Sequence, residues 1–313
     1  MASVRIAKPG LQTTIQDLGR WGYQANGVPV SGAMDIGAHR TANALAGNAA
    51  SAATLEITLV GPEFTCNRDC VIGVAGARFD VTVHGTPVPS ADSSFEVAAG
   101  QPVRFGARLG GARAYVAIDG GFIVPEILGS RSTHLSSRMG GFEGRALRAG
   151  DRIPIGAARA VSAQGLRALP LAAPGECVLR VLPSPDLERF DVAAFDALVS
   201  GPYVVRSESN RMGYRLRGPR VALREAGAKI SDAVPLGLIQ MPPLGDPVLL
   251  MADRPTTGGY AAIANVITAD IDLAAQLAPG DAFRFAPCSV DDALDAIFDR
   301  ERHIAQIEAS SRG

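Results

Sequence analysis

Residues 231–260 read SDAVPLGLIQMPPLGDPVLLMADRPTTGGY, two apolar segments separated by a Pro-Pro-Leu-Gly-Asp-Pro turn. Proline fixes φ and glycine permits positive φ, so these turns are held in particular shapes. The end of the stretch, DRPTTGGY, supplies a carboxylate, two hydroxyls and two unhindered glycine amides, a set that suits an anion or an amide ligand. The same residues are also typical of a tight connection between two barrel strands, and spacing alone does not separate the two interpretations.

The amino-acid composition limits the classes of protein to which the chain can belong. The 313 residues are 47% apolar and 19% charged, with 35 glycines and 21 prolines, which favours a β or mixed fold with many turns. A formal net charge of −1 gives no electrostatic basis for binding nucleic acid or an anionic membrane. The N-terminus shows no apolar leader segment, no stretch has the length of a membrane span, and four cysteines indicate no disulfide framework. We therefore expect a cytoplasmic location.

Short apolar runs separated by turn residues dominate the first half; they cover residues 54–60, 70–75, 79–83, 94–97, 103–105 and 114–118, and each is predicted to be a strand. The alternation in Phe79–Val83 is typical of a half-buried strand, and close spacing of such runs favours a barrel or sandwich. A helix is predicted from Asp35 to Ala46, with Ser31 or Asp35 near its N-cap and a stop at Gly47. Further helices are predicted over 186–198 and after Ser289. The fold class is therefore mainly β with a few helices.

Two segments suggest how the chain divides. The segment 120–144 is too polar and glycine-rich for core and too long for a hairpin, which is typical of functional or disordered loops. The segment 157–175 is rich in Ala, Pro and Gly and is predicted to be a linker. We thus expect an N-terminal domain over 1–156, a C-terminal domain over 176–288, and a C-terminal helix and tail over 289–313.

Two short motifs occur in both halves of the sequence. Arg20-x-Gly-Tyr matches Arg211-x-Gly-Tyr, and Leu147-x-x-Gly-Asp matches Leu277-x-x-Gly-Asp. Their offsets differ, so they form no regular repeat, yet together they favour two related barrel domains with unequal insertions.

The motif inventory excludes several kinds of chemistry. Lys8 and Lys229 are the only lysines, so no Gly-x-x-x-x-Gly-Lys-Ser/Thr phosphate loop is present. The four histidines lack metal-site spacing, so no metal is expected, and no Gly-x-Ser-x-Gly elbow occurs. What remains is carboxylates and amides in glycine-rich surroundings with arginines nearby, each of which is also typical of an ion pair or turn cap. Such a mix suits a small amide or carboxylate substrate, with a carboxylate as general base.

The chain resembles one family through motifs that run in order along nearly its whole length. They are TTIQDLGRWGY (13–23), GVPVSGAMD (27–35), ANALAGN (42–48), LEITLVGP (55–62), AYVAIDGGF (114–122), LGSRST (128–133), NRMGYRLRG (210–218), the long run 231–270 and AQLAPGD (275–281). The family is the biotin-dependent carboxyltransferase-like family, which includes the C subunit of 5-oxoprolinase, the so-called allophanate hydrolase subunit 2, the Kip antagonist and the matching part of urea carboxylase. The predicted linker and the C-terminal helix fall outside these motifs.

The resemblance implies two cyclophilin-like β-barrel domains and a subunit of an ATP-dependent 5-oxoprolinase that converts 5-oxo-L-proline to L-glutamate. It implies two partners, the Kip-inhibitor-like B subunit and a third protein, the A subunit, without which the chain is expected to be inactive. ATP would serve the complex at a site that the sequence does not locate. The missing phosphate loop fits a chain that contributes one part of such an assembly.

Site residues carry over from the resemblance on motif positions only. Asp253 is the preferred general base, and Asp17 and Asp35 are further catalytic candidates. Either Arg211 or Arg215 would hold an anionic group, and Thr257 with Gly258 would contact a carbonyl. The remaining substrate-binding candidates are Arg20, Asn43, Gln240, Thr256, Gly259 and Tyr260.

Two alternatives stay open at this stage. One is a carboxyltransferase component that carboxylates urea or another amide with biotin supplied in trans by a separate carrier. The other is a non-catalytic regulator that binds a Kip-inhibitor-like protein, although binding alone would not need the polar residues of 231–260. No residue in the sequence identifies the substrate.

Overall fold

The computed structural model describes residues 1–89, 92–158, 177–224, 229–242 and 246–310. The chain divides into two compact units. The first comprises Met1–Trp21, Ser31–Leu171 and Arg302–Gly313, and the second Gly22–Val30 and Ala172–Glu301. The predicted linker lies outside the described residues from residue 159 onward.

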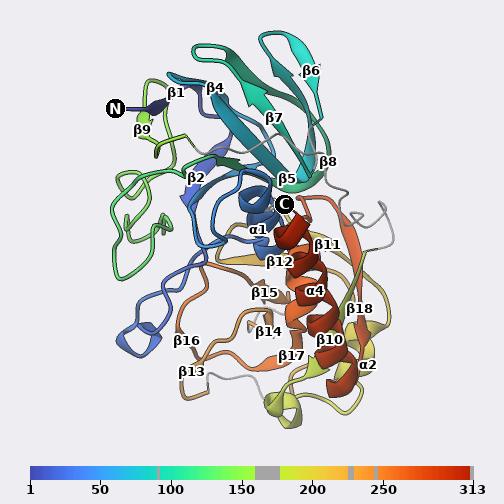
Figure 1. Ribbon diagram of the computed structural model, residues 1–313. Helices are drawn as coiled ribbons and strands as arrows, with labels where there is room; N and C mark the ends of the chain where they lie inside the picture. Colours follow the sequence, from blue (N-terminus) through green and yellow to red (C-terminus); the bar gives the residue numbers. More distant parts are fainter. Residues whose placement is uncertain (90–91, 159–176, 225–228, 243–245, 311–313) are drawn as a thin grey trace. The chain divides into compact units, whose positions relative to one another are not determined.

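The first unit is built on a nine-stranded sheet that curls around an apolar core (Figure 1). Its main path runs β2-β3-β8-β4-β1-β9, and β5 joins β8 and carries β6 and β7. The strands are β1 (Ser3–Lys8), β2 (Gln12–Gln16), β3 (Thr54–Thr58), β4 (Glu63–Cys66), β5 (Cys70–Val83), β6 (Thr86–Val88), β7 (Ser93–Val97), β8 (Pro102–Ile118) and β9 (Arg152–Pro154).

Strands β5 and β8 are longer than the sequence predicts. The apolar runs 70–75 and 79–83 were expected to be separate strands, as were 103–105 and 114–118. The structure joins each pair into one strand, of 14 and 17 residues respectively, so that expectation was wrong. The register of the β5–β8 pair shifts between Gly76 and Val81, and such bulges let a strand continue through residues that break the apolar pattern. Within β5, Phe79, Val81 and Val83 are buried and Asp80 is exposed, as the alternation predicted.

Helix α1 (Ile36–Leu45) packs on β5 and β8 and confirms the predicted helix. The Asp35 carboxylate accepts a hydrogen bond from the Ala38 amide at 2.7 Å, which makes Asp35 the N-cap. The approach of helix and sheet depends on Gly73, because a Cβ there would lie 2.3 Å from the Ala42 carbonyl oxygen.

The second unit is a closed barrel with strand order β10-β17-β14-β15-β12-β11-β18. Its first and last strands, β10 and β18, pair in parallel, and the other pairs are antiparallel. The barrel strands are β10 (Val178–Pro183), β11 (Pro202–Val205), β12 (Gly213–Arg217), β14 (Leu238–Gln240), β15 (Val248–Leu250), β17 (Ala262–Val266) and β18 (Ala282–Pro287); outside the barrel, β13 (Asp232–Ala233) pairs with β16 (Thr257–Gly258). The predicted mainly β fold is thus confirmed.

Short helices complete the second unit, and a long helix, α4, begins in the second unit and ends in the first, to which the residues from Arg302 belong. The helix predicted over 186–198 is instead a 3-10 turn and a short α-helix, because the backbone is extended at Phe190 and the first turn ends there. The helical elements are η1 (Gln24–Asn26), η2 (Pro185–Arg189), α2 (Ala194–Val199), η3 (Thr268–Asp270), α3 (Ile271–Ala275) and α4 (Val290–Ser310).

Ser289 caps α4 as predicted. Its hydroxyl accepts a hydrogen bond from the Asp292 amide and donates one to the Asp292 carboxylate. In the part of the chain that the structure describes, no helix is long and apolar enough to cross a membrane.

One of the two repeated motifs forms the same turn in both places. In Leu147–Asp151 the Asp151 carboxylate accepts from the Arg148 amide, and Gly150 has φ of 93°. In Leu277–Asp281 the Asp281 carboxylate accepts from the Ala278 amide, and Gly280 has φ of 94°. The other repeated motif, Arg-x-Gly-Tyr, does not have the same structure in its two places, because Tyr23 is exposed in a loop whereas Tyr214 is buried in β12.

Candidate functional site

A pocket of about 580 Å³ lies on the outer face of the barrel of the second unit. It is formed over three neighbouring strands, β12, β15 and β14, by the side chains that alternation directs away from the barrel core. Tyr214, Leu249 and Ile239, at the intervening positions of the same strands, are buried. The lining residues are Glu208, Asn210, Met212, Gly213, Arg215, Gln240, Pro242, Val248, Leu250, Pro255 and Tyr260.

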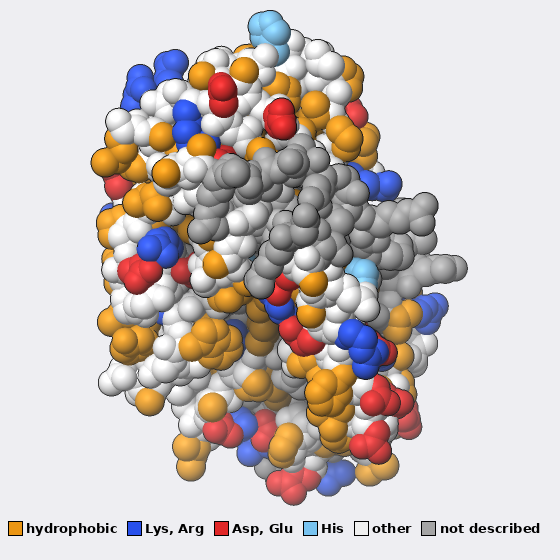
Figure 2. Space-filling model, in the orientation of Figure 1, with side chains coloured by type: hydrophobic (Ala, Val, Ile, Leu, Met, Phe, Trp, Pro, Cys, Tyr) orange, Lys and Arg blue, Asp and Glu red, His pale blue; other side chains and the backbone are white. Residues whose placement is uncertain are grey.

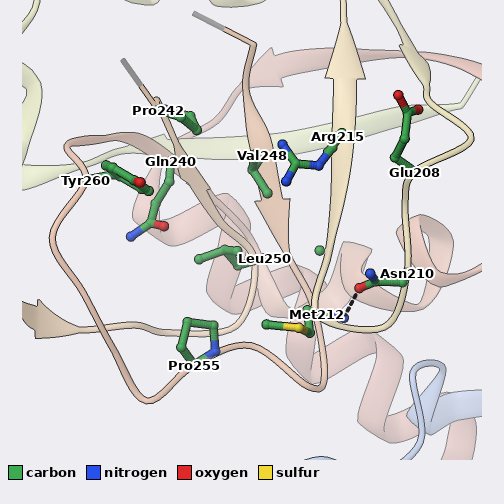
Figure 3. A pocket seen from close by; sticks show the side chains of 11 residues that line it. Glu208, Asn210, Met212, Arg215, Gln240, Pro242, Val248, Leu250, Pro255 and Tyr260 are labelled. Carbon is green, nitrogen blue, oxygen red and sulfur yellow. Dashed lines mark hydrogen bonds between the residues drawn. The ribbon is translucent and has the colours of Figure 1, made fainter. Parts of the chain in front are cut away.

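Strand register places Arg215 and Gln240 on either side of Val248. Both residues pair with Val248, one from β12 and the other from β14. Because neighbouring strands lie about 4.8 Å apart, the Cα atoms of Arg215 and Gln240 are separated by about 10 Å. Figure 3 shows the valine between the guanidinium and the carboxamide. A small ligand over Val248 is therefore within reach of both polar groups.

Gln240 is the unusual residue of the pocket. Its side chain is only 6% exposed, yet the carboxamide has no hydrogen-bond partner among the described residues. Its carboxamide atoms are not among the fully buried polar atoms that lack a partner, because they face the pocket. Gly258 makes room for it, since a Cβ at that position would lie 2.8 Å from Gln240 Nε2. The carboxamide is thus held ready for a partner from outside the described chain.

The other polar groups differ from Gln240 in their surroundings. Arg215 is exposed, and its guanidinium has no ion-pair partner within the described ranges. The Glu208 carboxylate accepts from Arg206 and Ser207, and in Figure 3 it points away from the pocket centre. Tyr260 lies close to Gln240 in the same view. As far as the structure describes the chain, the pocket thus offers one free cation and one free amide on a mostly apolar floor.

Arg211 and Asp253 form a buried ion pair next to the pocket. Two hydrogen bonds of 3.0 Å join the guanidinium to the carboxylate, and the Asp253 amide donates to the Arg211 carbonyl oxygen. Both side chains are at most 5% exposed, and neither lines the pocket. Their sequence neighbours Met212 and Arg254-Pro255 lead into its wall, so the pair fixes the two segments that carry Met212 and Pro255.

The remaining candidates of the DRPTTGGY segment shape the backbone beside the pocket. The Thr256 carbonyl oxygen accepts from the Val234 amide, and Thr257 and Gly258 form β16 against Ala233 and Asp232. The Gly259 carbonyl oxygen accepts from the Lys229 amide. The stretch 231–260 therefore folds back on itself, and Gln240 and Tyr260 are its predicted site residues that line the pocket.

In the first unit, Asp17 anchors the long loop 120–144. Its carboxylate accepts hydrogen bonds from the hydroxyls of Ser130 and Ser132 and from the amides of Arg131 and Gly19. Burial alone raises the pKa of Asp17, but these hydrogen bonds more than offset burial and the net pKa is below its ordinary value. Arg20 is also buried and donates to the Ser132 carbonyl oxygen at 2.6 Å.

Asp35 and Asn43 bond to the structure around α1. Asp35 caps the helix, and its own amide donates to the Tyr115 hydroxyl oxygen at 2.8 Å. The Asn43 carboxamide donates to the Ala52 carbonyl oxygen. Asp17, Arg20, Asp35 and Asn43 are all buried, and none lines the barrel pocket.

Several pocket residues were not among the sequence candidates. Met212, Val248, Leu250 and Pro255 give the pocket its apolar walls, and Asn210 shapes the turn before β12 by accepting from the Met212 amide. Asn210 and Met212 stand beside Arg211 in the motif NRMGYRLRG, which was the available signal. No group of three metal-ligating side chains occurs among the described residues.

The fold that carries the pocket has counterparts in known proteins. A family model described as "Carboxyltransferase domain, subdomain A and B" matches residues 26–287, most of the chain, so the protein belongs to that family. The resemblance inferred from the motifs is thereby confirmed.

Individual relatives show which members of this family the chain is similar to. The chain is 37% identical to the C subunit of 5-oxoprolinase from Escherichia coli over 306 residues, which cover 97% of each chain. The crystal structure of the Kluyveromyces lactis urea carboxylase matches 97% of this chain with a TM-score of 0.91 at 30% identity, but the match spans only 29% of that longer chain. The crystal structure of TTHA0988 matches 91% of this chain with a TM-score of 0.83 at 37% identity and spans 56% of its own.

Proposed function

We propose that this chain is the C subunit of an ATP-dependent 5-oxoprolinase, which opens the lactam ring of 5-oxo-L-proline to give L-glutamate. The observation that carries the proposal is the match to the E. coli C subunit, which covers 97% of both chains at 37% identity. The urea enzymes, by contrast, contain this fold as a minor part of a longer polypeptide.

The chemistry of the barrel pocket supports this substrate class. A lactam presents an N–H donor and a C=O acceptor on one edge, and a carboxamide is the side chain that can both accept and donate. Gln240 supplies that group without a competing partner among the described residues, and Arg215 supplies a cation for the carboxylate. The apolar floor over Val248 suits the ring methylenes. We assign Gln240 to the lactam edge, Arg215 to the carboxylate and Tyr260 to the ring face.

The three carboxylates predicted to be catalytic do not line this pocket. Asp253 as general base remains a proposal, and its ion pair with Arg211 supports a positioning role for both, because the pair holds the walls that carry Met212 and Pro255. Asp17 and Asp35 bond to the protein's own loop and helix. Thr256, Thr257, Gly258 and Gly259 support the site through backbone pairing around Gln240.

ATP does not fit the pocket. A nucleoside triphosphate needs several cationic or amide donors around its phosphates. Among the described residues, Arg215 is the one cation that lines the pocket, and of the two lysines Lys8 pairs with Glu63 and Lys229 with Asp186. We therefore place the nucleotide on a partner, either the Kip-inhibitor-like B subunit or the third protein, the A subunit, and expect no turnover by this chain alone.

A second candidate is amide carboxylation with biotin carried in trans. The TM-score of 0.91 to a urea carboxylase favours it. Urea is neutral and would leave Arg215 without a partner, whereas 5-oxoproline would pair it. The regulatory interpretation, binding of a Kip-inhibitor-like protein without catalysis, leaves the unpaired Gln240 without a purpose.

The test is reconstitution. The chain is purified together with the other two 5-oxoprolinase subunits, and ATP-dependent glutamate release from 5-oxoproline is measured for wild type, Arg215→Ala and Arg217→Ala. Arg217 is the matched control, because it is an exposed arginine on the same strand outside the pocket. We expect glutamate from wild type and Arg217→Ala, and at least about tenfold lower kcat/KM from Arg215→Ala. No glutamate, but transfer of a labelled carboxyl group from a carboxybiotin carrier to urea, would replace the proposal with carboxylation.

A further inference from the structure

Helix α4 carries a row of exposed apolar side chains. Val290, Leu294 and Phe298 are 61%, 49% and 64% exposed. Their spacing of four residues places them one above the other on a single face of the helix. Scattered single apolar residues on a surface need no explanation, but an aligned row that includes a phenylalanine marks an interaction site.

A row of acidic side chains runs beside the apolar row. Asp291, Asp295 and Asp299 each follow an apolar residue by one position, so they lie about 100° further around the helix. Residues 290–299 contain four aspartates and no basic residue. Figure 2 shows hydrophobic and acidic side chains gathered side by side over the part of the surface where the first half of α4 runs.

The apolar row is not what holds α4 in place. Ala293 and Ile297, on the neighbouring face, are partly buried, and Arg300 donates to the Asp272 carboxylate at 2.7 Å. The helix also lies beyond residues 26–287, the part of the chain that the family model matches. Neither the barrel core nor the pocket accounts for the exposed row.

We propose that Val290, Leu294 and Phe298 form the docking surface for a different protein chain, whose apolar side chains cover the row and whose lysines or arginines face Asp291 and Asp295. Apolar anchors with an oppositely charged rim are the usual anatomy of a heteromeric interface. The proposal rests on the proposed function for the identity of that chain, which is one of the other two 5-oxoprolinase subunits.

The acidic row favours a basic-rimmed partner protein over two other possible occupants, a second copy of this chain and an anionic membrane. A second copy of the chain would present an identical acidic row, and a twofold contact centred on the apolar row would bring the two rows of aspartates together. An anionic membrane would repel the same row, since interfacial helices carry lysine and arginine on their polar face. A basic-rimmed protein surface satisfies both rows.

The experiment measures assembly separately from catalysis. Each of the other subunits is titrated, alone and together, into wild type, Leu294→Ala/Phe298→Ala, Asp291→Asn/Asp295→Asn and Val192→Ser by calorimetry, and glutamate release is recorded in the same mixtures. Alanine keeps the helix, because it has the highest helix propensity. Val192 is the matched control, an apolar residue 91% exposed outside α4.

We expect the double alanine variant to raise the Kd by at least about 30-fold, as loss of an aromatic anchor does. The double asparagine variant should raise the Kd by about tenfold at low salt, and Val192→Ser should leave the Kd unchanged. An unchanged Kd for the double alanine variant overturns the proposal, as does absence of wild-type binding, a dimer of the chain alone that this variant dissociates, or binding of phosphatidylserine vesicles that it abolishes. A wild-type mixture that assembles without forming glutamate contradicts the proposed function, and the Kd values still decide the docking surface.

Discussion

Gln240 is the residue on which the proposed recognition of the lactam edge depends most directly. Its carboxamide lines the pocket, and a site with such a group gains specificity for a ligand that can hydrogen-bond to it. The assignment is therefore testable by a single substitution.

We predict that Gln240→Met raises the KM for 5-oxoproline in the reconstituted complex by about 10- to 100-fold, because methionine has a similar length but neither donates nor accepts strongly. The same change should alter the free energy of unfolding of the isolated chain by less than about 1 kcal/mol, because the carboxamide faces the pocket and is not among the buried unsatisfied groups. Steady-state kinetics and urea denaturation measure the two effects. Leu238→Met, on the same strand, is the control, and a destabilised variant with unchanged KM would show that Gln240 has a structural role.

His39 is a buried neutral residue of the first unit. Its ring nitrogens contact the Thr54 hydroxyl and the Ala50 carbonyl oxygen, and burial lowers its pKa to about 4. The unfolded chain takes up a proton near pH 6.5 whereas the folded chain does not. The contribution of His39 to stability is therefore complete above pH 6.5 and is lost as the pH falls from 6.5 toward 4.

We predict that His39→Gln removes about 3 kcal/mol of the stability change between pH 7.5 and pH 4, because one pKa unit corresponds to about 1.4 kcal/mol. Free energies of unfolding from urea titrations at several pH values measure it. The control is the exposed His84, replaced by asparagine, which tolerates its φ of 49°. Parallel pH profiles for wild type and His39→Gln would contradict the prediction.

At the scale of elements, the limits of sequence-based prediction lie in strand continuity and register. The cap at Asp35, the alternation in Phe79–Val83 and the cap at Ser289 were predictable, because each depends on residues within one or two turns. The continuation of β5 through Gly76 and Arg78 was not predictable, since it depends on pairing with β8, which is distant in the sequence. Residues close in sequence determine helix caps, whereas pairing with other strands determines strand length.

The candidate site shows the same division. Arg215, Gln240 and Tyr260 were predicted and do line the pocket. That Arg215 and Gln240 flank Val248 follows from the register of three strands, which no sequence spacing reveals. Asp17 and Arg211 were predicted for the site from charged residues in glycine-rich motifs; in the structure they bond to a loop and to Asp253 within the protein itself, and their role in ligand binding stays a prediction.

The contact between α1 and β5 gives a prediction at this scale. A Cβ on Gly73 would meet the Ala42 carbonyl oxygen of α1 at 2.3 Å, and backbone atoms cannot yield as a flexible side chain does. We expect Gly73→Ala to destabilise the protein by about 1–3 kcal/mol, as overpacking does. Urea denaturation measures it against Gly110→Ala in β8, where the nearest atom, at 3.3 Å, is the end of the Arg78 side chain. Equal stability of the two variants would show that helix and sheet can separate without cost.

At the scale of the whole molecule, the two units differ in how their polar residues are used. In the first unit the buried Asp17, Asp35 and Asn43 bond to the protein itself, whereas the second unit presents Gln240 and Arg215 to a pocket. The substrate-binding chemistry that we propose is thus concentrated in the barrel, and we propose that ATP binds to another chain.

The last prediction concerns the isolated chain. Because Lys8 and Lys229 are held in ion pairs and the described lining of the pocket offers one guanidinium, we expect ATP to bind the purified chain with a Kd weaker than about 1 mM, whereas 5-oxoproline binds measurably and Gln240→Met weakens it. Calorimetry with each ligand separates the two. Tight ATP binding that Arg215→Ala abolishes would place the nucleotide in the barrel pocket and displace the lactam from it. Binding of 5-oxoproline without detectable binding of ATP would support the proposal that a partner holds the nucleotide and that turnover requires assembly.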